Sequence, residues 1–376
     1  MENAKWLRWM VVFLGIMGVS YLLYMNLNNS EGTEEPEDEK AVADKNGLVG
    51  DGIADDTAAL QAAIDAVPPG GTLKLPAGTY KVSRNPALKA VTGYGESHFA
   101  LEITQPLTIE MDEVTIQTET DGRYGIFWIH DTADVHLKGG SLIGDKFPHD
   151  AELTSNIAVL LHETQNSTIE NTYTKNHSQG IHLHDADNNL IRNVTSEYNY
   201  GSGIINFSSN NNIIDSCTVR NSSDGHLSLY GVGENNTVVN CVVTEDRPDH
   251  TIEQGITVES EKNSRIENNT VNGFYYGIDI KNGAESNIIT SNNVFDNEYN
   301  IAIRPGDGGE NLLTPSHDIV ITNNFATNPR GDSHFGIFVD IGEGHVITGN
   351  TVNKGNLIIT DSDMFAKYEK QNFYVD

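Results

Sequence analysis

A phrase of apolar, polar and apolar residues that ends in asparagine returns along this chain from Ile169 onward. Its copies end at Asn171, Asn193, Ser216, Asn240, Asn269, Asn293, Asn324 and Asn350. The intervals run from 22 residues (Asn171 to Asn193) to 31 residues (Asn293 to Asn324), longer than a hairpin and shorter than an ankyrin or tetratricopeptide unit. Each copy shows β-branched alternation and no helical periodicity. The repeat therefore predicts a parallel β-helix, a stack of similar coils with three short strands each.

A glycine precedes most of these phrases and opens another short strand, as in GIHLH from Gly180. Glycine suits a tight bend there because it tolerates positive φ. Successive side chains of a strand point to opposite faces. We therefore expect Ile181 and Leu183 inside the coil, and His182 and His184 outside it.

The asparagines that end the phrases are expected to stack inside the coils, where each side-chain amide bonds the coils above and below. This arrangement is an internal asparagine ladder. Cys217 and Cys241 are the two cysteines of the chain, and each follows a predicted ladder residue by one position. We therefore expect stacked buried thiols on neighbouring coils, and not a disulfide.

The segment before the repeat, GDGIADDTAALQAAIDAVPPGGTLKLPAGTYKV, has a different pattern. Asp56 or Thr57 can cap a helix that continues to about Ala66, the PPGG run ends it, and two short strands follow. The end of a β-helix exposes unpaired backbone and an apolar interior, so an end cap is physically required. This segment is the predicted cap.

The pairing of GDGIADDTAALQAAIDAV with GGTLKLPAGTYKV resembles the N-terminal signature of the pectate-lyase-like superfamily, which includes lyases, galacturonidases, alginate C5-epimerases and phage tailspikes. The resemblance implies an all-β fold, a single-stranded right-handed parallel β-helix with an N-terminal helix cap. Parallel crossovers are nearly always right-handed in any case. Roughly ten coils spaced about 4.8 Å apart give a rod about 50 Å long. The fold alone does not determine the chemistry.

Lys5 and Arg8 precede an uncharged apolar run from Trp9 to Met25, with no small-residue cleavage site after it. This pattern predicts a transmembrane signal anchor at the cell membrane, with the bulk of the single-pass chain extracytoplasmic. A cleaved signal would instead release a secreted chain. The expected organisation is a cytoplasmic N-terminus (1–8), the anchor (9–26), an acidic linker (27–45), the cap (46–98), the β-helix (99–360) and a C-terminal tail (361–376).

Acidic residues outnumber basic residues 53 to 23, which gives a formal net charge of −30. The resulting field repels polyanions, so nucleic acid is not an expected partner. The same field opposes a uronic-acid polymer unless Lys and Arg gather locally or a divalent cation intervenes.

Three early coils share a histidine followed by an acidic residue. The phrases WIHDTAD, LLHETQN and HLHDADN align when they are anchored on Asp134, Asn166 and Asn188. The aligned pairs are His130–Asp131, His162–Glu163 and His184–Asp185. Stacked at strand spacing, these imidazoles would form a row on the outer face. The alternative is a solvated surface row without a function.

The same row continues along the rod with Phe207, Tyr230, Glu259, Lys281, Arg304 and Asp340. A one-residue slip in the coil of Gly203 is an alternative, because Asn206 would otherwise face inward. A face that runs from imidazole through phenol to cations suits a long polymer. We expect the catalytic groups, if there are any, on the N-terminal half of the stack.

For a polymer of acidic sugars, lyases and C5-epimerases begin alike: a base removes the C5 proton while the carboxylate is neutralised. Histidine suits the base because its ordinary pKa, about 6.5, lies near neutrality. The candidate catalytic residues are His184, His162 and Tyr230. The candidate substrate-binding residues are His182, Asp185, Glu163, His130, Lys281 and Arg304, of which Lys and Arg can hold a carboxylate.

The coils from Gln179 to Asn236 resemble the repeat region of bacterial alginate C5-epimerases, in which a Tyr-Gly-Ile-Asp-Pro-His-Asp phrase carries catalytic residues. The matching stretch here is QGIHLHD, in which His184 and Asp185 agree with the family. Gln179, His182 and Leu183 replace its Tyr, Asp and Pro. The resemblance implies a polysaccharide partner and a polysaccharide lyase or C5-epimerase.

Three alternatives stay open. The segment from Gly225 to Asn240 resembles part of the polygalacturonases, although a glycoside hydrolase needs paired carboxylates that the phrases here lack. A non-catalytic glycan-binding or cell-surface scaffold protein needs only the repeat and the anchor. The row of imidazoles could gather a transition metal, but an outward row diverges from a single point, so no metal site or cofactor is assigned. Calcium is an alternative for the acidic loops at Gly306–Asn311 and Asp246–Asp249.

Overall fold

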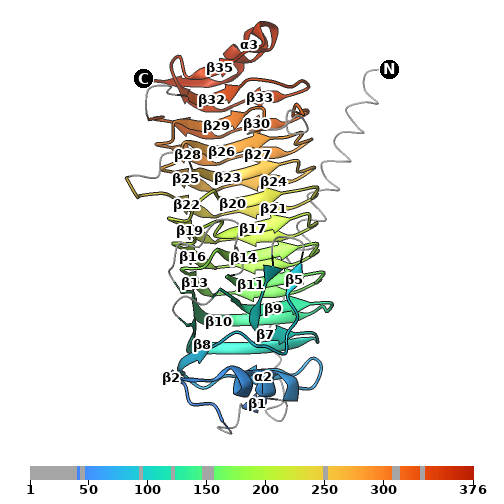
Figure 1. Cartoon of the computed structure of the whole chain (residues 1–376). Coiled ribbons are helices and arrows are strands. Elements are labelled where there is room, and N and C mark those ends of the chain that lie inside the picture. Colours follow the sequence, from blue (N-terminus) through green and yellow to red (C-terminus); the bar gives the residue numbers. More distant parts are fainter. Residues whose placement is uncertain are drawn as a thin grey trace, which may run out of the picture. The chain divides into compact units, whose positions relative to one another are not determined.

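The computed structural model describes residues 40–42, 47–92, 96–119, 123–145, 156–248, 253–306, 314–330 and 335–376. Within the unit from Ala41 to Asp376, the described strands stack as a right-handed parallel β-helix of about eleven turns, close to the roughly ten expected (Figure 1). A typical coil contributes three strands, as predicted: β14 (Gln179–His184), β15 (Leu190–Arg192) and β16 (Thr195–Glu197).

One sheet, called here the eleven-strand sheet, contains the first strand of each coil. Its members are β7 (Phe99–Ile103), β9 (Gly125–His130), β11 (Ile157–His162), β14, β17 (Ile204–Phe207), β20 (Gly225–Tyr230), β23 (Gln254–Glu259), β26 (Tyr276–Lys281), β29 (Tyr299–Ile303), β32 (Phe335–Val339) and β35 (Leu357–Ile359). All of its pairings are parallel.

The second sheet takes the other two strands of each coil. After β8 (Leu107–Thr118) and β10 (Val135–Ile143), which are long enough to span both positions, it contains β12 (Thr168–Glu170), β13 (Tyr173–Lys175), β15, β16, β18 (Ile213–Asp215), β19 (Thr218–Arg220), β21 (Thr237–Val239), β22 (Val242–Thr244), β24 (Arg265–Glu267), β25 (Thr270–Asn272), β27 (Ile288–Thr290), β28 (Asn293–Phe295), β30 (Val320–Thr322), β31 (Phe325–Thr327), β33 (Val346–Thr348) and β34 (Thr351–Asn353).

The ends of the stack have their own elements. The N-terminal end has β1 (Lys40–Val42), β2 (Asp51–Asp55), β3 (Thr72–Lys74) and β4 (Gly78–Val82), and a small hairpin of β5 (Val91–Thr92) and β6 (Glu96–Ser97). Residues 361–376, assigned to a tail, form α3 (Ser362–Tyr368), a 3₁₀ turn (Glu369–Gln371) and β36 (Phe373–Val375), which pairs with β34.

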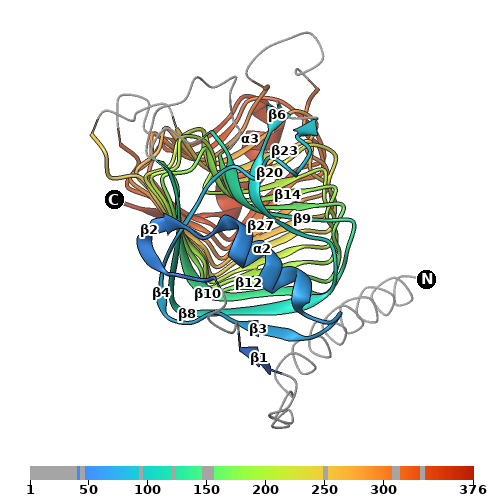
Figure 2. The same cartoon turned by 60° about the horizontal axis from the view of Figure 1, so that its bottom comes forward.

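The predicted cap helix is confirmed as α2 (Thr57–Ala66), which lies across the N-terminal end of the stack in Figure 2. Leu60 and Ile64 are buried beneath it and close the apolar interior. Asp56 occupies the N-cap position, but its carboxylate accepts hydrogen bonds from the backbone N–H groups of Val49 and Gly50, at 2.7 and 3.1 Å. Asp56 therefore holds the backbone of Val49 and Gly50 in place, while the cap helix covers the core.

The internal asparagine ladder exists, but part of its predicted register is wrong. In the described ladder Asn269, Asn292, Asn324, Asn350 and Asn372 are joined by Nδ2 to Oδ1 bonds of 2.9 to 3.0 Å. The misassigned positions are Asn171, Asn193, Ser216, Asn240 and Asn293, all of which are exposed. The first four have φ between 52° and 57°, so they are the left-handed bend residues that precede the ladder positions.

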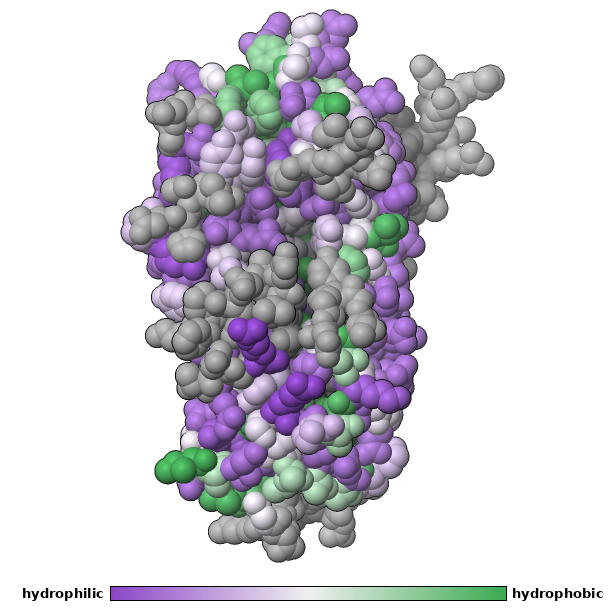
Figure 3. All heavy atoms as spheres, viewed as in Figure 1, coloured by the Kyte–Doolittle hydropathy of each residue, from purple (hydrophilic) through white to green (hydrophobic). Residues whose placement is uncertain are grey.

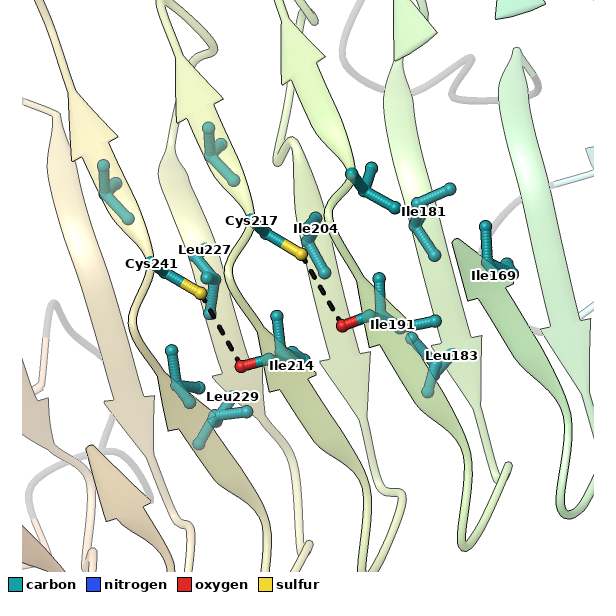
Figure 4. Packing of buried hydrophobic residues seen from close by; sticks show 14 of the residues in the cluster. Ile169, Ile181, Leu183, Ile191, Ile204, Ile214, Cys217, Leu227, Leu229 and Cys241 are labelled. Carbon is teal, nitrogen blue, oxygen red and sulfur yellow. Dashed lines mark hydrogen bonds between the residues drawn. The ribbon is translucent and has the colours of Figure 1, made fainter. Parts of the chain in front are cut away.

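Both cysteines are free and buried, as predicted. Cys241 stands in the column of the asparagine ladder, because its N–H donates to Asn269 Oδ1 at 2.8 Å. The Sγ atoms of Cys217 and Cys241 point into the interior and each contacts a carbonyl of the preceding coil, Ile191 or Ile214, at 3.6 Å (Figure 4).

A second internal ladder was not expected from the sequence. The N–H of Asn189 donates to Asn212 Oδ1 at 2.7 Å, and the N–H of Asn212 donates to Asn236 Oδ1 at 2.9 Å. The same column continues through Ser264 and Asn287. The two ladders satisfy backbone groups at bends that would otherwise be buried without partners.

The predicted anchor (9–26) lies outside the described residues, and so does nearly all of the acidic linker. No helix in the part of the chain that the structure describes is long and apolar enough to cross a membrane. Hydrophilic residues cover most of the described surface on the face that Figure 3 shows.

Candidate functional site

The predicted outward row on the eleven-strand sheet is confirmed in register. His162 pairs with His130 on one side and with His184 on the other. The row continues through Phe207, Tyr230, Glu259 and Lys281 in consecutive pairings. The slip considered at Gly203 does not occur: Asn206 faces inward, wholly buried, and its amide donates to the Ser209 carbonyl at 3.0 Å.

Three imidazoles gather on β11 and β14. The ring centroids of His162 and His184 are 5.2 Å apart, and those of His182 and His184 are 5.6 Å apart. Burial lowers the pKa of the half-buried His184 below its ordinary 6.5, and the neighbouring His162 lowers it further, against the opposing effect of Asp185. The pKa of the fully buried His182 falls to about 3, again mainly through burial. His184 is therefore a neutral imidazole at neutral pH.

His182 points away from the core of the coil, as predicted, yet only 1% of its surface is exposed. A substrate could reach it only through its neighbours. His182 is thus better placed to pack against His184 and hold its ring than to bind a sugar directly. Sequence alternation shows which face a side chain takes but not what covers it.

His130, at the start of the row, is held differently. Its Nε2 lies 2.9 Å from Glu102 Oε1, its Nδ1 lies 2.8 Å from Asp131 Oδ2, and its ring stacks on Trp128 with centroids 3.6 Å apart. Both ring nitrogens are therefore engaged. His130 is therefore held by Glu102, Asp131 and Trp128, apart from the trio of His162, His182 and His184, although all four histidines lie on the eleven-strand sheet.

The acid that follows each histidine has a backbone explanation. Asp131, Glu163 and Asp185 have φ of 50°, 51° and 49°, so each forms the left-handed bend that ends its strand. Asp readily tolerates this conformation and Glu less readily. The Oδ2 atom of Asp185 also lies 3.7 Å from His184 Nε2. The recurrence of acids is thus partly structural, and Asp185 is the one that also contacts the imidazole trio.

Tyr230 does not join the imidazoles. Phe207 stands between them, 4.9 Å from the His184 ring and 5.3 Å from the Tyr230 ring. Of the three predicted catalytic residues, the structure brings His162 and His184 together and leaves Tyr230 two strands away from His184.

The two predicted cations lie further along the same face, in an ion-pair network. Arg304 donates to both carboxylate oxygens of Asp279, at 2.8 and 2.7 Å. Lys281 Nζ lies 3.6 Å from Asp279 and 3.5 Å from Glu259. β26 is four strands beyond β14, or about 19 Å at 4.8 Å per strand. Sequence reasoning missed Asp279, because a lone acid inside a strand gives no signal of a buried pair.

His226, in the segment that resembles the polygalacturonases, cannot serve a substrate. Its side chain is wholly buried, its ring packs edge-on against Phe274 with centroids 4.6 Å apart, and Nε2 lies 3.2 Å from Glu245. Residues 307–311 of one acidic loop and Asp249 of the other lie outside the described residues. Within those that are described, no group of three or more His, Cys, Asp or Glu side chains could hold a metal ion.

The fold is a right-handed parallel β-helix in which a cap precedes the coils. A family model described as "Right handed beta helix region" matches residues 149–295, and one described as "Rhamnogalacturonase A/epimerase, pectate lyase-like" matches residues 42–97. The second match covers the predicted cap, and the first covers the coils of the imidazole trio.

Individual proteins that are similar to this chain include two mannuronan C5-epimerases and a phage tailspike. Mannuronan C5-epimerase AlgE5 of Azotobacter vinelandii is 64% identical over 39 residues, which are 10% of this chain and only 4% of the length of that relative. The A-module of the epimerase AlgE4 from the same organism has a TM-score of 0.52 at 20% identity, covering 85% of this chain and 99% of the module. A tailspike of E. coli bacteriophage HK620, in complex with a pentasaccharide, has a TM-score of 0.64 at 15% identity, covering 86% of this chain and 64% of the tailspike.

Proposed function

We propose that this chain modifies an acidic polysaccharide by abstracting the C5 proton of a uronate unit, as a lyase or a C5-epimerase, with His184 as the base. The observation that carries the proposal is His184 itself, an imidazole kept neutral by burial on the outer face and placed between His162 and His182. A neutral imidazole near the working pH is a competent general base. The local identity with mannuronan C5-epimerases supports the same chemistry.

The substrate carboxylate must also be neutralised. Lys281 and Arg304 are too far from His184 for the same sugar unit, and Asp279 and Glu259 already balance their charges. A ring N–H of His162 is a closer donor to an oxygen held beside His184, because the two ring centroids are 5.2 Å apart. Hydrogen bonds within a poorly solvated site are also strengthened. His162 is therefore assigned to holding the uronate carboxylate.

The test uses the full chain in D₂O with polymannuronate, polyguluronate and polygalacturonate. Proton NMR reports the deuterium that an epimerase places at C5, while absorbance near 235 nm reports the C4=C5 double bond that a lyase leaves, because elimination keeps no hydrogen on C5. We expect one of these two signals with at least one polymer. If none of the polymers gives either signal, the proposal fails.

A non-catalytic glycan-binding protein is the second candidate. The separation of Tyr230 from His184 by Phe207, and the pairing of the two cations, favour it. The same experiment separates the two candidates: retention of a polymer by the chain with neither deuterium at C5 nor absorbance near 235 nm would favour binding alone.

We further propose that the β-helix lies outside the cytoplasmic membrane, attached through residues 9–26. The apolar run and the Lys5 and Arg8 that precede it support this placement. In intact cells, an added protease should digest the β-helix, whereas a cytoplasmic marker protein should stay intact. Protection of the β-helix until the cells are lysed would contradict the placement.

A further inference from the structure

A run of aromatic side chains occupies the eleven-strand sheet beyond the imidazole trio. Tyr276 of β26, Tyr299 of β29 and Phe335 of β32 are paired in register. Their ring centroids are 4.9 and 4.6 Å apart. Tyr275 and Phe338 pack on the same group, 5.4 and 5.3 Å from Tyr299. These five residues are called the aromatic strip.

The rings of the aromatic strip are half-buried, so each packs on its neighbours and keeps part of its surface open. A closed structural cluster would bury such rings completely, as Phe274 and Tyr80 are buried elsewhere in the chain. Aromatic rings supply a large rigid apolar surface at a small entropic cost. A contiguous strip on the outer face is a suitable platform for a flat apolar surface of a ligand.

A charged group adjoins the strip. The Arg304 guanidinium lies 4.3 Å from the centre of the Tyr276 ring and is paired with Asp279. Asp279 is wholly buried and Arg304 is only 7% exposed, although both stand on the outer face of the coils. Burying such a pair contributes little to stability compared with apolar side chains of the same size. Its contact with the Tyr276 ring does, however, fix the position of that ring within the strip.

We infer that the aromatic strip, with Asp279 and Arg304, is a second subsite that binds a sugar unit of the same polysaccharide. The apolar face of the pyranose ring stacks on Tyr299. Asp279 is wholly buried and Arg304 nearly so, so this pair holds the Tyr276 ring of the strip in place and does not contact the sugar. The formal charges of Asp279, Glu259, Lys281 and Arg304 sum to zero, so the pair adds no net charge beside the stacked sugar. This inference rests on the polysaccharide substrate of the proposed function.

The position of the subsite predicts a dependence on chain length. β29 lies five strands beyond β14, or about 24 Å at 4.8 Å per strand. One sugar unit bound at His184 cannot reach Tyr299, whereas an oligosaccharide of several units that runs along the rod can reach both. Long ligands should therefore gain affinity from the strip, and short ligands should not.

The test compares Tyr299→Ala with the matched control Phe325→Ala in the full chain. Phe325 is an aromatic side chain on β31 of the second sheet and is 57% exposed. Calorimetric titrations use oligomannuronate, oligoguluronate and oligogalacturonate of graded length. Loss of one stacked ring should weaken the binding of long oligosaccharides about tenfold, whereas short ones and the control variant should be unaffected. Tyr299→Phe keeps the ring and should restore the affinity.

Each outcome has a distinct meaning. Equal affinity of Tyr299→Ala and the wild-type chain for long oligosaccharides overturns the subsite, as does a failure of the wild-type chain to bind any of them. If C5 deuteration or absorbance near 235 nm occurs but does not depend on Tyr299 at any chain length, the proposed function stands and the subsite fails. If length-dependent binding requires Tyr299 but neither signal appears, the subsite stands and the proposed function fails.

Discussion

His184→Gln is expected to slow the C5 reaction, whether epimerisation or elimination, by about 10²- to 10⁴-fold, the range that a positioned general base contributes. Glutamine is polar, neutral and similar in size, so the contacts with His162 and His182 should change little. It has no group that can take the proton. The rate of deuteration by NMR, or of the rise in absorbance near 235 nm, checks this expectation when it is measured with the full chain at pH 7.5 under saturating polymer.

His317→Gln is the matched control. His317 also neighbours a carboxylate, with Nδ1 3.0 Å from Asp318 Oδ2, but its side chain is 41% exposed and it lies at a bend outside the eleven-strand sheet. Its substitution should leave the rate unchanged. A His184→Gln rate within about threefold of the wild-type rate would exclude His184 as the base, because a positioned general base contributes at least about 10²-fold.

The pH dependence follows from the same burial. Burial lowers the pKa of His184, so the imidazole is neutral and active above that value and becomes protonated and inactive below it. The rate should therefore be level from pH 8 down to about 6.5, the ordinary pKa of histidine, and should fall only at lower pH. A rate that already falls between pH 8 and 7 would contradict a lowered pKa at the base.

Most of the stack could be predicted because its physical requirements repeat in every coil. Strand alternation placed Ile181 and Leu183 inside, and the bend residues Asp134, Asn166 and Asn188 fixed the register of the histidines. The ladder was partly misassigned because two adjacent positions favour asparagine for different reasons. One needs a left-handed backbone, and the next needs an amide that bonds to neighbouring coils.

The site was less predictable because its properties depend on what surrounds each side chain. Sequence alternation could place Lys281 and Arg304 in the outer row, but it could not show that Asp279 and Glu259 neutralise them. Sequence alternation could place His184, Phe207 and Tyr230 in one row. It could not show that the Phe207 ring packs against both of the other rings. Arg304 and Asp279, like Lys281 and Glu259, come from different coils, at sequence separations that no local pattern encodes.

Glu261 carries the largest expected effect on stability. Its side chain is buried at the bend after β23, where Oε1 accepts hydrogen bonds from Asn236 Nδ2 at 2.5 Å and Ser264 Oγ at 2.6 Å. A Cβ atom at Gly233 would lie 2.7 Å from Oε2, so glycine leaves room for the carboxyl group. Burial raises the pKa of Glu261 to about 7 from the usual 4.5.

Between pH 4.5 and about pH 7, the folded chain therefore keeps a proton on Glu261 that the unfolded chain has released. Below pH 4.5 the carboxyl is protonated in both states and imposes no ionisation penalty. As the pH rises from 4.5 to 7, the unfolded chain ionises first, so the free energy of unfolding falls, and above pH 7 the loss is complete. A difference of about 2.5 pKa units at 1.36 kcal/mol each corresponds to about 3 kcal/mol.

Glu261→Gln should remove this dependence, because glutamine keeps the oxygen that accepts from Asn236 and Ser264 and does not ionise. Between pH 4.5 and 8, the variant should gain about 3 kcal/mol in free energy of unfolding relative to the wild-type chain. Guanidinium titrations at both pH values measure this difference, with Glu343→Gln, at an exposed position, as the control. A wild-type-to-variant difference that stays constant with pH would show that Glu261 is ionised in the folded chain, with a counter-charge that offsets its burial.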